Sequence, residues 1–401
     1  MMKSGQLMQH GRHGRHGPPV LLARLAVCSA IVGSLVACSF APPAEPPMAA
    51  RESVPPPGPA GDSAAATASG PPLVQAKSRW VPVPWSQLPQ WPQDALHEAW
   101  PAWVLSCQRP APALAKVCPQ VRQLAQAGPD EQRRFMLERL QPYRVESLTG
   151  QAEGLLTGYY EPVMAASRRP QGRFTVPLYA PPPGLSARKP WYTRQEMETL
   201  GAARQALRGK ELLYLADPVD AMVVQIQGSG LMNVTEADGR QRLVRLAFAA
   251  TNEQPYKSIG RWLLDQNLVR DASWPGIKDW IARHPARLNE LLWSNPRVVF
   301  FKEEPVPDST SAQGPRGAQG VPLTAGRSIA VDRESIPYGT PVWLSSSGAQ
   351  TSLNRLVLAQ DTGTAIVGAV RADYYAGSGE AAGELAGRLK QPLRLWVLWP
   401  R

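Results

Sequence analysis

The stretch 358–377, LAQDTGTAIVGAVRADYYAG, places two carboxylates, Asp361 and Asp373, in a run of apolar residues and glycines. Surface acids usually stand among polar residues, whereas these two follow the strand-like segments 356–359 and 366–370. A carboxyl group held near the end of a buried strand tends to have a raised pKa, which a general acid working near neutral pH requires. The alternative interpretation is a pair of turn-forming aspartates.

The two aspartates belong to a C-terminal region of short, strand-like segments. These segments cover 328–331, 341–344, 355–359, 366–370 and 393–398. Many short strands separated by glycine turns predict a small closed β-barrel. The glycine-rich segment after Asp373 leads into one short helix that ends near Leu389.

The middle of the chain also contains β-prone segments. The aromatic run 154–162 is one of them, and the apolar run 221–227 predicts a buried strand. Asp238-Gly239 indicates a hairpin between the β-like stretches 232–235 and 241–247.

Helices are predicted on both sides of these strands. Thr193 and Glu196 have the spacing of a capping box, which opens a helix toward Leu207. The other predicted helices cover 94–100, 114–127, 130–140, 258–268, 277–284 and 286–293.

The first 37 residues are typical of an export signal. A basic start precedes an apolar region that is too short to span a bilayer as a mature helix. The segment 35–38, LVAC, resembles the bacterial lipobox, in which Cys38 would be lipidated and become the new N-terminus. Ser39 after the cysteine favours the outer membrane over retention at the inner one. The alternative is an ordinary signal peptide in which Cys38 is incidental.

The segment 38–78 is predicted to be a lipid-anchored flexible linker, because it is rich in Pro, Ala, Gly and Ser. The chain has 43 Lys and Arg against 32 Asp and Glu. Four of the basic residues lie in the signal segment, which has no acids, so its removal would lower the formal net charge of +11 by four, to +7. Basic residues do not cluster with aromatic ones, so we expect no nucleic-acid binding.

Besides Cys38, two other cysteines remain in the predicted mature chain, Cys107 and Cys118. Outside the cytoplasm such a pair can form a disulfide, and the intervening Arg-Pro-Ala-Pro could turn one helix back on the other. Three of the five His lie in the signal segment, and neither cysteine has a neighbouring His. The sequence therefore predicts neither a metal site nor a cofactor.

Eight short motifs occur in an order that points to one family. They are TGYYEP (157–162), QIQGSG (225–230), YKSIG (256–260), NPRVVFF (295–301), AVD (330–332), IPYGT (336–340), DTG (361–363) and RAD (371–373). The chain resembles the membrane-bound lytic murein transglycosylase A family over 150–401, and more loosely over the helices from residue 80. Its C-terminal part resembles the three-aspartate module, whose aspartates match Asp332, Asp361 and Asp373.

The resemblance implies a mainly β fold with two domains. The N-terminal helical part, 79–160, would complete a double-psi β-barrel with the C-terminal module, 320–401. A smaller β-rich domain, 161–319, would be inserted between them. The substrate groove would run between the two domains, where ligand sites commonly form.

The resemblance also implies the activity of a peptidoglycan lytic exotransglycosylase, a carbon–oxygen lyase. It would cleave the β-1,4 bond between N-acetylmuramic acid and N-acetylglucosamine without water and leave 1,6-anhydro-N-acetylmuramic acid ends. Asp373 would be the single general acid and then the base, with Asp361 as a supporting acid. The expected partners are glycan strands and the outer membrane of a Gram-negative-type bacterium. Cell-wall synthesis or division proteins are further candidates, and we expect a monomer.

Seven residues are candidate substrate-binding residues: Thr157, Tyr159, Gln225, Gln227, Gly228, Ser229 and Asp332. Each has a structural alternative. Strand aromatics are usually core, the glutamines need partners if buried, and Gly228 and Ser229 could simply turn the chain. Asp332 is either a structural turn acid or a site residue.

Two departures from the family pattern concern Glu161, where a threonine is common, and Thr364, where a second glycine is usual. The DTG triplet also matches the aspartic-protease signature, but such proteases need two apposed aspartates of this kind and this chain has one. A non-catalytic envelope lipoprotein that binds glycan is the non-enzymatic alternative. An intact acid at Asp373 favours the enzyme.

Overall fold

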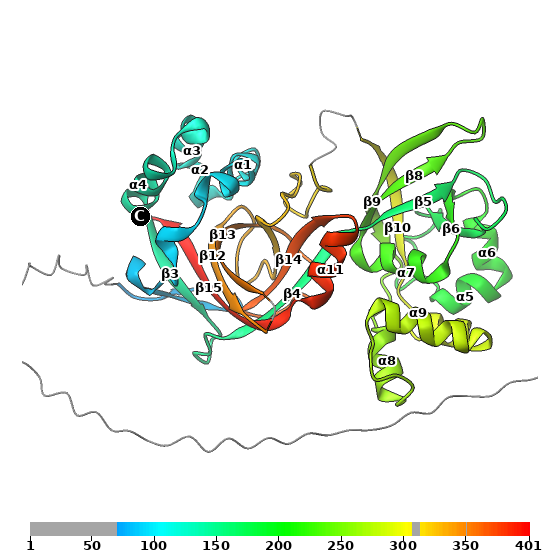
Figure 1. The fold of residues 1–401 in the computed structure, drawn as a ribbon. Helices are drawn as coiled ribbons and strands as arrows, with labels where there is room; N and C mark the ends of the chain where they lie inside the picture. The colour runs from blue at the N-terminus through cyan, green and yellow to red at the C-terminus, as the bar shows by residue number, and fades with distance from the viewer. Residues whose placement is uncertain (1–69, 307–312, 350) are drawn as a thin grey trace, which may run out of the picture. The chain divides into compact units, whose positions relative to one another are not determined.

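The computed structural model describes residues 70–306, 313–349 and 351–401 (Figure 1). The predicted signal segment, Cys38 and the linker as far as residue 69 lie outside the described residues. Strand β1 (Leu73–Val74) pairs with β2 (Arg79–Pro82), and Leu73 packs against the barrel core. Regular structure therefore begins before the predicted end of the linker at residue 78, because Leu73 finds apolar contacts there.

The first sheet of the described chain has nine strands in the order β1-β2-β3-β15-β12-β13-β11-β14-β4. Beyond β1 and β2, its strands are β3 (Leu140–Glu146), β4 (Gly154–Glu161), β11 (Ser328–Val331), β12 (Pro341–Ser347), β13 (Ser352–Asp361), β14 (Arg371–Ser378) and β15 (Lys390–Pro400). An additional pairing of β15 with β4 closes β15, β12, β13, β11, β14 and β4 into a ring. The predicted closed barrel is thus present, with β4 from the middle of the chain and five strands from its C-terminal part.

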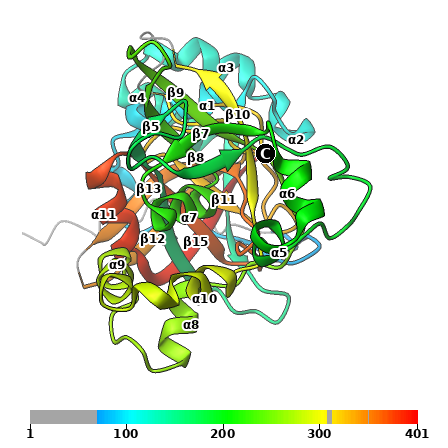
Figure 2. The ribbon, with the colours of Figure 1, turned by 90° about the vertical axis from the view of Figure 1, so that its right-hand side faces the viewer.

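The barrel is filled by apolar side chains that alternate along its strands, as in Ile329 and Val331 on β11 and Val342 and Leu344 on β12. Helix α11 (Glu380–Arg388) lies beside β4 and β14 (Figure 1), and Figure 2 shows the same helix in a view turned by 90°. Gly158 on β4 permits this approach, because a Cβ there would lie 2.7 Å from the Ala386 backbone.

Four helices precede the barrel strands, where the sequence predicts helices. They are α1 (Leu96–Ser106), α2 (Pro112–Ala115), α3 (Cys118–Gln123) and α4 (Pro129–Arg139). The predicted helix 114–127 is divided, because Pro119 opens a separate helix at α3. Trp100 and Trp103 of α1 are buried in a cluster that also contains Trp343 of β12, so the helices share the core of the barrel sheet.

The second sheet has six strands in the order β10-β9-β8-β5-β7-β6. They are β5 (Val163–Ser167), β6 (Val176–Tyr179), β7 (Glu211–Leu215), β8 (Ser229–Thr235), β9 (Gln241–Thr251) and β10 (Val299–Pro305). Its helices are α5 (Arg194–Thr199), α6 (Gly201–Leu207), α7 (Pro218–Gln227), α8 (Ile259–Asp265), α9 (Trp274–Arg283) and α10 (Leu288–Trp293). Helices α8, α9 and α10 share one apolar cluster with α7.

Two local predictions in this part are confirmed. Thr193 accepts a hydrogen bond from the Glu196 amide while the Glu196 side chain accepts one from the Thr193 amide, which is the predicted capping box. Strands β8 and β9 form the predicted hairpin, with Gly239 in the left-handed region at a φ of 85°.

The predicted strand 221–227 is wrong, since these residues belong to helix α7. Asp217 caps the helix by accepting a hydrogen bond from the Val219 amide, and Pro218 occupies its first turn. Gly228 ends it in a left-handed conformation, with φ at 82°. A short apolar run fits a buried strand and a buried helix equally well, so the caps decide the structure here.

The predicted strand 366–370 is also wrong, because β14 begins only at Arg371. The Ile366 amide donates to the Gly363 carbonyl in a turn, and Gly368 has a φ of 117° that interrupts an extended chain. The segment that connects the two aspartates is therefore a loop.

A buried ion pair joins the two sheets where the chain passes from β4 to β5. The Arg245 Nε on β9 donates to Glu161 Oε1 at 2.7 Å, and Nη2 donates to Oε2 at 3.0 Å. The Glu161 side chain is 0% exposed, and Ser378 of β14 donates to it as well. Burial raises the pKa of Glu161, while Arg245 lowers it. The glutamate that departs from the family pattern thus has a matched cation.

We predict that Arg245→Met lowers the free energy of unfolding by about 3–5 kcal/mol, because a buried carboxylate loses its partner. Without Arg245 the folded-state pKa of Glu161 rises further above its unfolded value, so the loss grows as pH rises from about 5 to 8. Urea denaturation of the full chain measures it. The matched control, Glu161→Gln with Arg245→Met, should recover most of the stability, and an equal loss at both pH values would contradict the prediction.

Candidate active site

Four neighbouring strands bring the candidate residues into one row across the barrel wall. Ala330 on β11 pairs with Asp361 on β13 at one side and with Asp373 on β14 at the other. Asp373 in turn pairs with Thr157 on β4. Residues in register on adjacent strands point to the same face of a sheet. The two carboxylates are therefore placed on either side of the small Ala330 side chain.

Each carboxylate has its own set of hydrogen-bond donors. The Tyr159 hydroxyl donates to Asp361 Oδ2 at 2.9 Å, and the Ala318 amide donates to Asp361 Oδ1 at 2.9 Å. The Thr157 hydroxyl donates to Asp373 Oδ1 at 2.6 Å. Arg371 Nη2 donates to the Thr157 oxygen at 2.8 Å, so Arg371 orients the hydroxyl toward Asp373.

Both carboxyl groups are shifted toward the protonated form. Burial raises the pKa of Asp361 to about 6, and the neighbouring Asp373 adds to the shift, while its amide and Tyr159 donors oppose it. Burial also raises the pKa of Asp373, opposed by Thr157 and by the charge of Arg371. Two partly desolvated like charges, separated by the single strand β11, resist ionising together.

The two carboxyl groups differ in the number of hydrogen bonds that they accept. Asp361 accepts from the Ala318 and Thr362 amides and from Tyr159, whereas Asp373 accepts from Thr157 alone. Hydrogen bonds to the charged form favour ionisation. Asp361 therefore has more donors to its charged form than Asp373, while the charge of Arg371 lowers the pKa of Asp373 as well.

Asp332 has a different environment. It accepts from Lys77 Nζ at 3.1 Å and from the amides of Glu334 and Gly368. These donors lower its pKa despite burial. Asp332 thereby fixes the loop that follows Asp361 through its bond with the Gly368 amide. Its lowered pKa favours the ionised form.

Gln225 and Gln227 lie on helix α7 and have separate partners. Gln225 Oε1 accepts from Arg194 Nη2 at 2.7 Å, while Gln227 Oε1 accepts from the Tyr160 amide at 3.0 Å. On a strand, side chains two residues apart would share one face, but residues 225 and 227 are helical and their side chains point in different directions. Gln227 nevertheless contacts the same strand, β4, that carries Thr157 and Tyr159.

Gly228 and Ser229 connect α7 to β8. Gly228 is explained by its left-handed backbone, and a Cβ there would meet no atom within 4 Å. Ser229 is buried in β8 and pairs with Ala247. The next residue, Gly230, is tightly packed, since a Cβ there would lie 2.5 Å from the Met232 side chain.

Sequence reasoning missed Arg371 and the Ala318 amide. Arg371 lies two residues before Asp373 on one strand, and the period of two could have indicated that both face the same side. Ala318 carries no such signal, because its contact to Asp361 comes from a distant loop. Thr364, the other departure from the family pattern, is exposed in the loop after Asp361.

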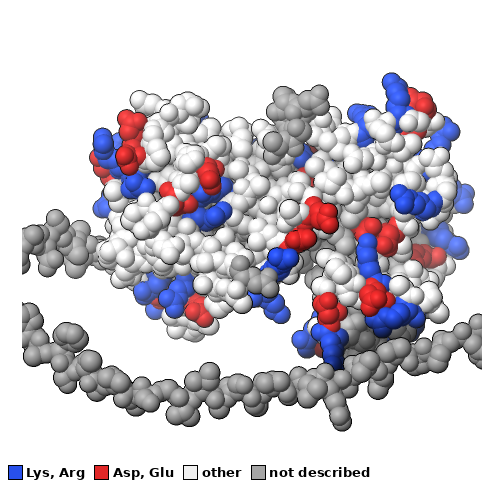
Figure 3. Space-filling model, in the orientation of Figure 1, with Lys and Arg blue, Asp and Glu red and all other residues white. Residues whose placement is uncertain are grey.

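A hollow of about 480 Å³ lies beside the loop that follows Asp361. Tyr338, Thr362 and Gly363 line it together with the ion pair of Lys77 and Asp332. Within residues 70–306, 313–349 and 351–401, no group of three metal-ligating side chains occurs and no helix is long and apolar enough to cross a membrane. On the face shown in Figure 3, basic and acidic side chains are interspersed.

Two family models match the two parts of this architecture. The model described as the MltA specific insert domain matches residues 155–302, and the 3D domain model matches residues 327–399. The second match contains Asp332, Asp361 and Asp373. The chain is thus of the class that combines a 3D-domain barrel with this insert.

Named relatives specify the family. The chain is 35% identical to membrane-bound lytic murein transglycosylase A of Vibrio cholerae over 62% of its length and 37% identical to that of Escherichia coli over 60%. The alignments span 66% and 64% of those relatives' own length. Among solved structures, the lytic transglycosylase LtgG of Burkholderia pseudomallei is 42% identical, with a TM-score of 0.57 over 84% of this chain and 99% of that one.

Two further structures have the same fold. MltA from Neisseria gonorrhoeae is 30% identical, with a TM-score of 0.68 over 84% of this chain and 97% of that one. E. coli MltA with bound chitohexaose is 26% identical, with a TM-score of 0.62 over 82% of this chain and 93% of that one. The chain belongs to the membrane-bound lytic murein transglycosylase A family. The family predicted from the ordered motifs is confirmed.

We predict that Tyr159→Phe shifts the acid limb of the pH–activity profile to higher pH by about one unit, since Tyr159 donates to ionised Asp361 and lowers its pKa. Activity at pH 5 should fall roughly tenfold, with a smaller loss at pH 8. Tyr143→Phe on β3, outside the six-strand ring, is the control. A uniform loss for Tyr159→Phe at every pH would contradict this role.

Proposed function

We propose that this protein is a peptidoglycan lytic transglycosylase in which Asp373 is the catalytic acid and base. The observation that carries the proposal is the row Asp361–Ala330–Asp373–Thr157, where two like charges are placed together and supplied with unequal numbers of donors. Such an arrangement leaves one carboxyl group protonated near neutral pH, which is the state that glycosidic-bond protonation requires. The relatives' names as lytic murein transglycosylases support the same activity.

In the first step, protonated Asp373 donates its proton to the oxygen that links N-acetylmuramic acid to N-acetylglucosamine. The bond from C1 to that oxygen breaks, and positive charge develops at C1. Ionised Asp361, two strands away on the same face, stabilises this charge electrostatically. The Arg371–Thr157 pair holds the Asp373 oxygen that accepts from Thr157, so the other oxygen is directed to the substrate.

In the second step, the muramoyl 6-hydroxyl attacks C1, and its proton passes to the Asp373 carboxylate. The product has a 1,6-anhydro ring, and Asp373 returns to its protonated state without water. A hydrolase would need a second carboxylate to form a covalent intermediate or to activate water. An internal nucleophile removes that need and benefits from proximity.

We assign supporting roles to the other predicted site residues. Thr157 and Tyr159 orient the carboxyl groups and stand at the edge of the glycan path. Gln227 binds the backbone of the same strand, so Gln225, Gln227, Gly228 and Ser229 would place the insert's edge along the glycan. Asp332 supports the loop after Asp361. The chitohexaose bound to the E. coli relative, a chain of N-acetylglucosamine units, supports a glycan-binding groove.

We further infer that the barrel has the double-psi topology and that the enzyme is a periplasmic lipoprotein held at the outer membrane through Cys38. The ring of β15, β12, β13, β11, β14 and β4 mixes parallel and antiparallel pairs, which supports that topology. The relatives' printed names as membrane-bound support the anchor. Globomycin treatment of producing cells should leave the uncleaved precursor if Cys38 is lipidated, whereas a mature chain without lipid would oppose it.

We expect the full chain to release 1,6-anhydro muropeptides from purified sacculi, detected by mass. Asp373→Asn should abolish release by at least about a thousandfold, because the general acid is lost. Release of reducing ends would instead indicate a hydrolase, and sacculus binding without release would indicate the glycan-binding alternative. Cleavage of casein would support the aspartic protease.

The same substitution has a predicted effect on stability. The folded-state pKa of Asp373 lies above its unfolded value of 3.8. Ionisation of Asp373 therefore lowers the free energy of unfolding at pH values above the folded-state pKa, and this loss disappears as the pH falls toward 4. Asp373→Asn should therefore raise the free energy of unfolding at pH 8, with a difference that shrinks toward pH 4. Urea unfolding measures this without any substrate. A loss of stability at pH 8 would contradict the shift.

A further inference from the structure

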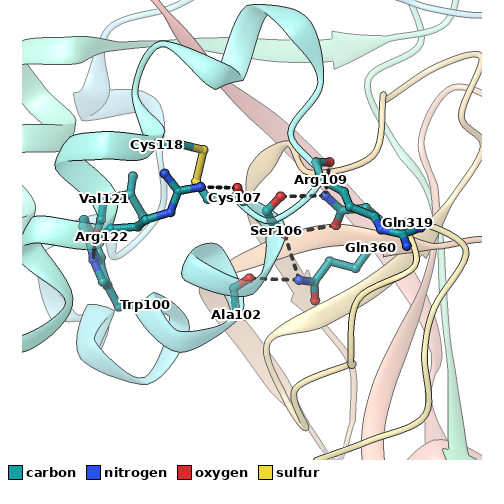
Figure 4. Close-up of a disulfide and its surroundings, with 10 residues drawn as sticks. All are labelled: Trp100, Ala102, Ser106, Cys107, Arg109, Cys118, Val121, Arg122, Gln319 and Gln360. Carbon is teal, nitrogen blue, oxygen red and sulfur yellow. Dashed lines mark hydrogen bonds between the residues drawn. A yellow bond between two sulfur atoms is a disulfide. The ribbon is translucent and has the colours of Figure 1, made fainter.

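The loop that supplies the Ala318 amide to Asp361 is held by one buried side chain. Gln319, the next residue, is 7% exposed, and its side chain bonds to Ser106 at the end of helix α1 and to Arg109 just after it. Its Nε2 donates to the carbonyls of Ser106 at 3.1 Å and Arg109 at 3.0 Å, and its Oε1 accepts from the Ser106 hydroxyl at 3.1 Å. Figure 4 shows these bonds between the loop and the helix end.

A second buried glutamine connects the same helix to the strand that ends in Asp361. Gln360 Nε2 donates to the Ala102 carbonyl at 2.9 Å and to the Ser106 hydroxyl at 2.8 Å (Figure 4). Its backbone carbonyl accepts from the Gln319 amide at 3.0 Å. Gly317 allows this close packing, because a Cβ there would lie 2.5 Å from that carbonyl oxygen. Ser106 is therefore a shared anchor for the loop and for the strand.

The anchor is itself fixed by a disulfide. Cys107, next to Ser106, is bonded to Cys118, 11 residues along the chain, and both are buried. Arg122 donates to the Cys107 carbonyl, and Trp100 Nε1 donates to the Val121 carbonyl at 2.8 Å, so α1 and α3 are held together on both sides of the bridge. A continuous series of contacts thus runs from the disulfide through Ser106 and Gln319 to Ala318.

We propose that Gln319 is a positioning residue for the catalytic pair: it clamps the loop onto the disulfide-fixed end of α1 and so holds the Ala318 amide on Asp361. This role goes one step beyond the proposed function and rests on it. The amide bond favours the carboxylate form of Asp361, so loosening the clamp makes Asp361 harder to ionise. The disulfide acts through the same clamp and rigidifies it.

The other titratable groups near Asp361 remain in place when the clamp is loosened. They are Asp373 and Tyr375 from β14, Tyr159 from β4 and Tyr338 from the loop after β11. Arg371 faces Asp373 through Thr157. A shift that follows a change at Gln319 therefore reports the loop amide rather than a lost charge.

Gln319→Met in the full chain tests this, because methionine keeps the size of the side chain and removes its hydrogen bonds. The acid limb of the pH–activity profile on sacculi should move to higher pH by about half a unit to one unit, with several-fold lower activity at pH 5 and nearly unchanged activity at pH 8. The matched control is Gln132→Met on α4, another buried glutamine, whose Nε2 donates to the Leu124 carbonyl of the same helical layer. It should lower stability without moving the limb.

Replacing both cysteines by serine should move the limb in the same direction by a smaller amount, and a reductant should reproduce the shift in the wild type only. An unmoved limb in Gln319→Met, with a stability loss like that of Gln132→Met, would overturn the proposal. Anhydro products from the wild type establish the proposed function separately. If the wild type releases no anhydro products, the pKa of the Asp361 carboxyl group is measured by carbon-13 titration in the same variants. A raised Asp361 pKa in Gln319→Met but not in Gln132→Met supports the clamp. Equal Asp361 pKa values in the two variants overturn it.

Discussion

Repulsion between two partly desolvated carboxylates is the constraint on which the site depends. Asp361 and Asp373 flank Ala330 on three adjacent strands, and water cannot fully screen either charge. Burial raises the pKa of both carboxyl groups, and the charge of Asp373 raises that of Asp361 further. The barrel supplies them with unequal numbers of donors, two amides and a phenol on Asp361 and one hydroxyl on Asp373, and we propose that this difference leaves the proton on Asp373. The chemistry then needs a single acid, since the proposed nucleophile belongs to the substrate.

The architecture follows from the need to assemble this row from distant parts of the chain. Closure of the ring requires β4 beside β14, and β4 precedes the inserted domain whereas β14 follows it. The insert therefore leaves the barrel one residue after Glu161, whose buried pair with Arg245 fixes the point of departure. The helices before β3 have an equivalent role on the other side, because α1 anchors both the Asp361 strand and the loop that contacts it.

Much of this was predictable from local patterns. The glycine turns, the capping box at Thr193 and the Asp-Gly hairpin encode their own structure within a few residues, and the ordered motifs identify the family. Helix α7 was wrongly predicted as a strand because an apolar run of seven residues has no decisive period. The segment 366–370 was wrongly predicted as a strand because Gly368 interrupts an otherwise strand-like run. The contacts of Ala318 and Gln319 could not be predicted from local patterns. The Ala318 contact joins residues 43 positions apart, and the Gln319 contact joins residues 213 positions apart.

The most direct test of the central claim is to observe the two carboxyl groups separately. Carbon-13 NMR of the labelled full chain, with Asp361→Asn and Asp373→Asn for assignment, gives the protonation of each group against pH. Asp361 is expected to ionise near pH 6, and the proposed role of Asp373 as the general acid requires that it still holds its proton when Asp361 has lost its own. A protonated Asp361 beside an ionised Asp373 at neutral pH would contradict it.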